Sequence, residues 1–113
     1  FHSPLMQDAA VEFEKFLADI TFNDPKINLF SNVTGGKVID GDQAKKAAVL
    51  HLTHPVLWTD EEACLADVIK DGDEWSVLEV GPGKVLSGLW GQTEFGATLA
   101  AVPVNTAEGV SAL

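Results

Sequence analysis

Residues 75–90 read Trp75-Ser76-Val77-Leu78-Glu79-Val80-Gly81-Pro82-Gly83-Lys84-Val85-Leu86-Ser87-Gly88-Leu89-Trp90, and this stretch decides the fold class. Residues 75–80 are rich in β-forming side chains, which predicts a strand. The glycines and the proline of residues 81–83 turn the chain, and residues 84–90 are predicted to return as a short helix. A strand that passes through a glycine turn into a helix is typical of α/β proteins.

The same alternation extends along the whole chain. Ser3-Pro4 predicts a helix start, because serine is a good N-cap and proline fits the first helical turn. Later helices are predicted to begin at Asp40 or Asp42 and behind a capping box at residues 59–62. The full expectation is helices over 4–21, 42–52, 60–72, 84–90 and after 105, and strands over 27–33, 75–80 and 98–102, with 38–39 as a brief strand or a loop. We therefore expect an α/β fold in which helices alternate with short, mostly parallel strands.

Two helices are predicted to carry an apolar face, and the face of the first is expected to need cover from upstream residues. In the first, the apolar residues recur at 3.6-residue spacing, and they are Leu5, Ala9, Phe13, Phe16, Leu17 and Ile20. In the helix behind the capping box, which is predicted to end at Gly72, the buried residues are expected to be Cys64, Leu65, Val68 and Ile69. Parallel strands need cover on both faces, so we expect the isolated chain to be marginally stable.

Composition excludes several classes of partner. The 113 residues leave room for one domain, and 17 acidic against 7 basic side chains give a formal charge of −10. Nucleic acid and anionic membrane surfaces need a basic footprint, so neither is expected as a partner. The single cysteine, Cys64, fits a reducing compartment, and no apolar run reaches the roughly 18–20 residues that span a membrane. The chain opens on Phe1 rather than on methionine, so we expect it to come from a longer protein.

Few arrangements in the sequence carry chemistry on their own. His2, His51 and His54 lack the spacing of a metal site, so no metal is expected. No Gly-x-Ser-x-Gly elbow supplies a serine nucleophile. The turn at residues 81–83 offers N–H groups to a phosphate, although a plain strand-to-helix turn is the better interpretation. His2 precedes a helix cap, where scaffolds present reactive groups, and it is a candidate general base.

Five segments, in this order and spacing, together resemble the C-terminal part of malonyl-CoA:acyl carrier protein transacylases. They are Phe1-His2-Ser3-Pro4-Leu5-Met6, Phe22-Asn23-Asp24-Pro25-Lys26-Ile27, Ser31-Asn32-Val33-Thr34-Gly35, Pro55-Val56-Leu57-Trp58 and Glu79-Val80-Gly81-Pro82-Gly83-Lys84-Val85-Leu86-Ser87-Gly88-Leu89. The resemblance implies that residues 1–113 form the C-terminal part of the large α/β-hydrolase-like subdomain of an acyltransferase. Such a segment is incomplete without the upstream sequence.

The resemblance also implies an activity. In this family a serine takes the malonyl group from coenzyme A, and the pantetheine thiol of acyl carrier protein then accepts it, as a step of fatty acid biosynthesis in the cytoplasm. No cofactor is implied, because the coenzyme A thioester is the substrate. The serine, an arginine and the oxyanion hole lie upstream in the family. The implied partners are malonyl-CoA, acyl carrier protein and the missing N-terminal part of the enzyme, and we expect no activity from this chain alone.

Residue by residue, the resemblance implies five site positions. His2 matches the histidine of the Phe-His-Ser-Pro motif, which is the general base that activates the serine. His51 falls at the position whose main-chain carbonyl orients that base. Asn32, Gly81 and Gly83 lie in the shared motifs and are expected to shape the site.

Three alternatives stay open. A histidine at position 51 also resembles the acyltransferase domains of modular polyketide synthases, where a phenylalanine before the catalytic histidine, as at Phe1, accompanies malonyl specificity. The second alternative is a non-catalytic α/β interaction domain. The third is a small phosphate-binding module that uses Gly81 to Gly83.

Overall fold

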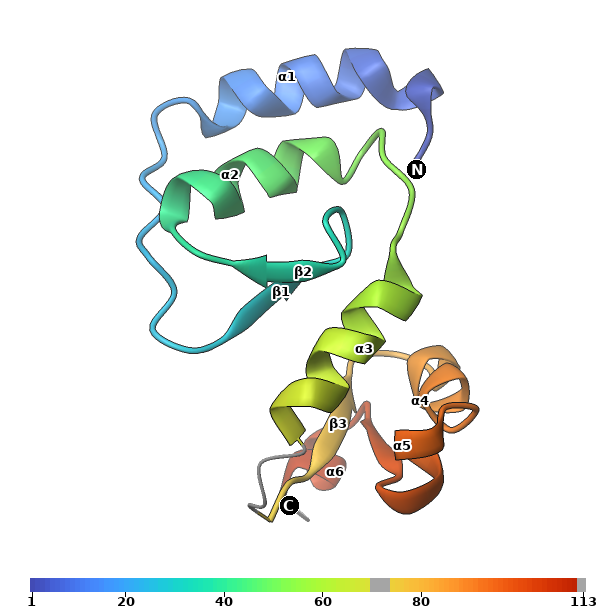
Figure 1. Cartoon of the computed structure of the whole chain (residues 1–113). Coiled ribbons are helices and arrows are strands. Elements are labelled where there is room, and N and C mark those ends of the chain that lie inside the picture. The colour runs from blue at the N-terminus through green and yellow to red at the C-terminus, as the bar shows by residue number, and fades with distance from the viewer. Residues whose placement is uncertain (70–73, 112–113) are drawn as a thin grey trace. The chain divides into compact units, whose positions relative to one another are not determined.

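The computed structural model of the chain describes residues 1–69 and 74–111 (Figure 1). Its contacts divide the chain into two units, Phe1–Leu65 and Ala66–Leu113, and helix α3 (Trp58–Ile69) belongs to both. Each unit has a small core. The buried apolar side chains are Ala10, Leu17 and Val38 in the first unit and Ala66, Trp90 and Val104 in the second. In the described part of the chain, no helix is long and apolar enough to cross a membrane.

The first unit begins with the helix that Ser3-Pro4 predicts. A 3-10 turn, η1 (Pro4–Met6), leads into α1 (Gln7–Leu17), and the Ser3 hydroxyl accepts a hydrogen bond from the Leu5 amide at 3.3 Å. Helix α2 (Gly41–Leu50) is capped by Asp40, whose carboxylate accepts from the Gln43 amide at 2.7 Å. Both helix starts are therefore confirmed, because each depends on a side-chain cap that lies next to the helix in sequence.

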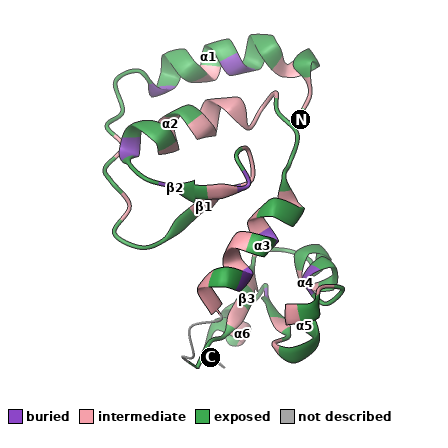
Figure 2. Cartoon of the chain, in the orientation of Figure 1, coloured by how far each residue is buried: buried purple, intermediate pink, exposed green. Residues whose placement is uncertain are grey.

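The apolar face predicted for α1 is mostly uncovered. α1 lies along α2 (Figure 1), and this packing buries Ala10 and Leu17. Leu5, however, is 94% exposed and Phe16 is 69% exposed. Most of α1 is exposed (Figure 2), so the face that is expected to need cover from upstream residues is open in this chain. The spacing identified an apolar stripe, but α2 covers only one side of it.

A short antiparallel pair of strands lies beside α2. Strand β1 (Leu29–Ser31) pairs with β2 (Gly36–Val38), with Leu29 opposite Val38 and Ser31 opposite Gly36. The brief strand expected near residues 38–39 is thus a hairpin partner of β1. The chain reverses tightly between the two strands, at Gly35, whose φ is +65°. A loop this short joins antiparallel strands, whereas parallel strands need a longer crossover.

Helix α3 begins two residues earlier than the sequence predicts. Its first residue is Trp58, which puts Thr59 inside the first turn, so the prediction that Thr59 is the N-cap is wrong. The buried residues are Glu62 and Ala66, while the four residues predicted to be buried, Cys64, Leu65, Val68 and Ile69, are half-buried. Glu62 and Ala66 are four residues apart and share one face of the helix. The predicted end of this helix at Gly72 lies outside the described residues.

The second unit contains the parallel pair that the sequence predicts. Strand β3 (Val77–Val80) pairs in parallel with β4 (Ala101–Val104), from Val77 opposite Ala101 to Val80 opposite Val104. The crossover between them contains α4 (Val85–Trp90) and α5 (Glu94–Thr98), and α6 (Ala107–Ser111) follows β4. This strand–helix–strand crossover, together with the helices of the first unit, confirms the α/β class.

One helix of the crossover was not anticipated. Residues 98–102 were expected to form a strand, but α5 occupies residues up to Thr98 and the strand begins at Ala101. The Thr93 hydroxyl caps α5 by accepting from the Gly96 amide at 2.9 Å. The Trp90 indole N–H donates to the Leu99 carbonyl at 2.7 Å and fixes the chain where it leaves α5.

Candidate active site

His2 lies in the extended loop that precedes η1. Its φ is +58°, the left-handed region that residues other than glycine rarely adopt. The next residue anchors the loop, because the Ser3 amide donates to the Leu52 carbonyl at 3.4 Å, just beyond the end of α2. His2 itself is exposed. An exposed imidazole on an anchored, strained loop is accessible to a substrate and held near α2.

The second histidine of the site stands at the C-cap of α2. The rings of His2 and His51 meet edge to face, with centroids 6.0 Å apart and an interplanar angle of 80°. His51 is half-buried. Two histidines 49 positions apart in sequence are thus brought together by the anchoring of the N-terminal loop on the end of α2.

Asn32 connects His51 to the end of β1. The His51 Nε2 atom is hydrogen-bonded to Asn32 Oδ1, and the Asn32 main-chain carbonyl accepts from the Leu57 amide at 2.7 Å. Because the Asn32 oxygen is an acceptor, the proton of this bond resides on His51 Nε2. Three of the site positions predicted from the sequence, His2, His51 and Asn32, are therefore contiguous in the first unit.

The pair His51–Asn32 lines a cavity of about 310 Å³ between the β1–β2 hairpin and α2. Most of its lining is apolar, and Glu61 of α3 is the other ionisable residue there besides His51. Burial lowers the pKa of His51, and the neighbouring His2 lowers it further. Burial raises the pKa of the Glu61 carboxyl. Both shifts favour the uncharged form of the group.

Glu61 was missed by sequence reasoning. Its position follows from the segment before α3, which is attached to Asn32 through the Leu57 amide. No local pattern marks this residue, since it is one of several acidic residues at the start of a helix. The predicted role of the His51 carbonyl in orienting His2 stays a prediction. The contact that the structure gives for these two residues is between their rings.

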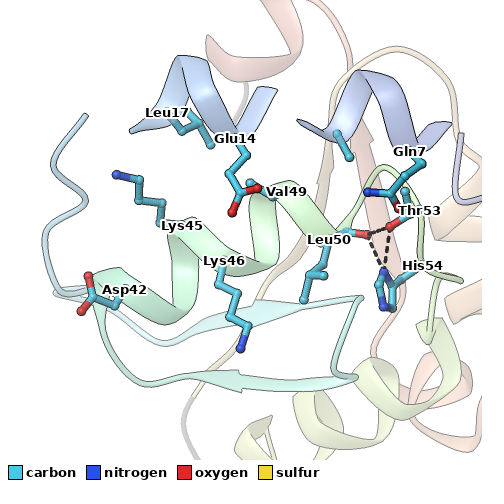
Figure 3. A pocket seen from close by; sticks show the side chains of 11 residues that line it. Gln7, Glu14, Leu17, Asp42, Lys45, Lys46, Val49, Leu50, Thr53 and His54 are labelled. Atoms are coloured by element: carbon cyan, nitrogen blue, oxygen red, sulfur yellow. Dashed lines mark hydrogen bonds between the residues drawn. The ribbon is translucent and has the colours of Figure 1, made fainter. Parts of the chain in front are cut away.

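The third histidine faces a different part of the first unit. His54 lines an open groove of about 460 Å³ between α1 and α2 (Figure 3), where its Nδ1 atom is hydrogen-bonded to the Thr53 hydroxyl at 3.0 Å and to the Leu50 carbonyl at 3.1 Å. His51 and His54 therefore line separate hollows. Among the described residues, no three His, Cys, Asp or Glu side chains are placed to hold a metal ion.

Gly81 and Gly83 belong to the second unit, at the turn between β3 and α4. Their φ angles are +137° and +102°, and a Cβ atom at either position would meet nothing within 4 Å. These glycines are thus required by the backbone conformation rather than by lack of space. Gly81 also extends the parallel pair, because its amide donates to the Val104 carbonyl at 3.1 Å.

The helix after this turn is capped by a carboxylate of the chain itself. Glu79 accepts hydrogen bonds from the Leu86 amide at 3.1 Å, the Ser87 amide at 2.8 Å and the Ser87 hydroxyl at 2.6 Å. These amides are the ones that a phosphate would need. The structure therefore gives no support to the phosphate-binding alternative, which the sequence had left open.

Glu79→Gln should destabilise the chain at neutral pH. The Ser87 hydroxyl and amide hold the pKa of the Glu79 carboxyl below its usual range. A carboxyl of lowered pKa contributes stability above its ordinary pKa and loses that contribution as the pH falls through its folded pKa. The melting temperature of the variant should thus be lower than that of the wild-type chain at about pH 7, and the difference between them should be smaller at about pH 3.

Glu74→Gln, the same change at an exposed residue of the second unit, is the control and should leave the melting temperature unchanged. An equal difference between Glu79→Gln and the wild type at both pH values would contradict the capping role of the charge.

Comparisons with known proteins agree with the motifs. No protein-family model matches the chain. It is 41% identical over 88 residues to the malonyl CoA-acyl carrier protein transacylase of Escherichia coli K12, a match that covers 78% of this chain and 27% of that protein. The crystal structure of the malonyl-CoA:ACP transacylase of Synechocystis superposes with a TM-score of 0.82 at 28% identity, covering 100% of this chain and 36% of that one.

A further solved structure contains a carrier protein. It is a malonyl-transacylase in complex with its type II polyketide synthase acyl carrier protein, and it matches with a TM-score of 0.80 at 31% identity, over 99% of this chain and 35% of that one. The chain thus spans between 27% and 36% of the lengths of these relatives. In sequence and in fold, the chain is similar to one part of the malonyl-CoA:acyl carrier protein transacylases.

Proposed function

We propose that this chain supplies the general base of a malonyl transfer from coenzyme A to the pantetheine thiol of acyl carrier protein, and that His2 is this base. Residues 1–113 would be the C-terminal segment of the acyltransferase domain. The observation that carries the proposal is the contact of His2 with the His51–Asn32 pair in a chain related to these transacylases. Backbone strain of about 1–3 kcal/mol at a functional residue supports the same assignment.

In the proposed reaction His2 moves one proton in each half. Its unprotonated ring nitrogen takes the hydroxyl proton of a serine as that oxygen attacks the thioester carbonyl, and the imidazolium returns the proton to the departing coenzyme A thiolate. In the second half the base takes the proton of the pantetheine thiol and returns it to the serine. The serine lies outside this chain, which contains no elbow motif. The reaction needs no cofactor, because the thioester supplies the activated acyl group.

The proposal includes three partners, malonyl-CoA, acyl carrier protein and the remainder of the enzyme, and a location in the cytoplasm. Apolar side chains of the first unit support the third partner, since Leu5, Phe16 and Ile27 are each at least two-thirds exposed.

A second pathway is favoured by one comparison. The complex described above joins a malonyl-transacylase to the carrier protein of a type II polyketide synthase. The carrier of this chain's enzyme would then belong to a polyketide synthase rather than to fatty acid synthesis. The chemistry at His2 is the same in both pathways, so a comparison of the two carrier proteins as acceptors distinguishes them.

The test of the proposed function is a chimera in which this chain replaces the segment of the Escherichia coli transacylase that it matches. We expect the chimera to transfer malonyl from malonyl-CoA to pantetheine-bearing acyl carrier protein. A chimera that folds, binds malonyl-CoA and transfers nothing would overturn the proposal and favour a non-catalytic interaction domain.

A further inference from the structure

His51 is held between two groups that come from different parts of the first unit. On one side its Nε2 atom is hydrogen-bonded to Asn32 Oδ1, just after β1. On the other side its ring and that of His2 meet edge to face. The bond to an amide oxygen fixes the proton on Nε2. A carboxylate at the same position would accept the same hydrogen bond, but it would add a negative charge that stabilises the imidazolium. Asparagine therefore supplies a hydrogen bond without supplying a counter-charge.

The other charged and titratable groups near His51 do not provide that counter-charge either. Glu61 of α3 lines the same cavity, but the pKa of His51 is set by burial and by His2, with no contribution from the Glu61 carboxyl. His54, three residues further along, lines the α1–α2 groove and is bonded to Thr53 and Leu50. His2 is itself a potential cation, and it disfavours a second positive charge on His51.

The charge of His51 matters for its neighbour. A positive charge next to an imidazole disfavours protonation of that imidazole and so weakens it as a base. Resting on the function proposed for His2, we propose that Asn32 is a positioning residue: it fixes the His51 ring in its Nε2–H tautomer without supplying a counter-charge, so that the ring stays uncharged beside the base. His2 is then free to take up and release a proton without a competing charge at its side.

The first test needs no activity. In ¹H–¹⁵N correlation spectra of the ¹⁵N-labelled chain, His51 should be in the Nε2–H form at neutral pH. It should also accept its second proton at a lower pH in the folded chain than in the chain unfolded in urea, because burial lowers its pKa. A His51 ring in the Nδ1–H form, or one that titrates alike in both states, would overturn the proposal.

The second test changes the charge of the partner and little else. In Asn32→Asp the new carboxylate faces His51 Nε2, so His51 should take up its second proton at a higher pH than in the wild-type chain. Asn28→Asp makes the same change at an exposed position and should leave the titration of His51 unaltered. Equal titration of His51 in Asn32→Asp and the wild type would overturn the proposal. If Asn32→Asp does not fold, Asn32→Ala provides the test. Loss of the hydrogen bond should weaken the preference of His51 for its Nε2–H tautomer, and an unchanged tautomer preference would overturn the proposal.

The third test uses the chimera. Asn32→Asp should lower kcat/KM near neutral pH by about tenfold, and the loss should shrink as the pH rises and His51 gives up its proton. A purely structural defect would lower kcat/KM by the same factor at every pH, and that result would contradict the proposal. A chimera without any activity would instead refute the proposed function, while the two spectroscopic tests would still decide the state of His51.

Discussion

Replacing His2 with alanine is expected to lower kcat/KM for malonyl transfer by the chimera by about 10²–10⁴-fold, the usual size of a general-base contribution. This loss corresponds to about 2.7–5.5 kcal/mol of transition-state stabilisation. His2 is exposed, and its ring meets that of His51 edge to face, so its removal should leave the fold of the first unit intact. Steady-state kinetics over a range of malonyl-CoA concentrations measure the effect, which should be mainly on kcat.

His54→Ala is the matched control. It makes the same substitution at an exposed histidine that lies three residues beyond His51 but lines the α1–α2 groove instead. We expect kcat/KM of this variant to stay within about twofold of the parent chimera, since surface substitutions away from the site have small effects. An equal loss in the two variants would show that the effect of His2→Ala is not specific to a base at that position.

Gly41→Ala is expected to lower the free energy of unfolding by about 2–3 kcal/mol. A Cβ atom at Gly41 would overlap the main-chain carbonyl of Phe22, which no side-chain rotation relieves. The Gly41 amide also donates to Asp24 Oδ1 at 2.9 Å, so the backbone cannot shift without straining this bond. Because α2 begins at Gly41 and ends beside His51, the same change should loosen the site. Urea titration followed by circular dichroism measures the loss.

Gly36→Ala provides the comparison for that prediction. Gly36 lies in β2 of the same unit, and a Cβ atom there would meet nothing within 4 Å. Its free energy of unfolding should stay within about 0.5 kcal/mol of the wild-type value. If Gly41→Ala were tolerated as well as Gly36→Ala, the close approach of α2 to residue 22 would be wrong.

The parts of the fold that local chemistry determines were predictable from the sequence. Ser3 and Asp40 cap the helices that follow them, and the glycine turn at residues 81–83 separates β3 from α4 as expected. The features that the sequence did not predict depend on contacts between distant parts of the chain. Which side of α1 is covered depends on where α2 lies, and the start of β4 depends on how far α5 extends.

The candidate site was predictable only in part. The place of His2 before a helix cap makes it a candidate from the sequence alone. Its contact with His51 depends on the hydrogen bond between the N-terminal loop and Leu52, and no sequence spacing predicts that bond. The resemblance to the transacylases predicts His2, His51 and Asn32 as site residues. It did not supply the hydrogen bond between Asn32 and His51, which depends on how β1 and α2 pack. Glu61 was missed for the same reason.

The most direct test of the account is the rate at which the chimera is acylated in a single turnover with malonyl-CoA, followed by intact-protein mass. If His2 is the base, the parent chimera should form the malonyl-enzyme, and His2→Ala should form it about 10²–10⁴-fold more slowly while malonyl-CoA binds with unchanged affinity. Acylation of His2→Ala at the rate of the parent chimera would contradict the account.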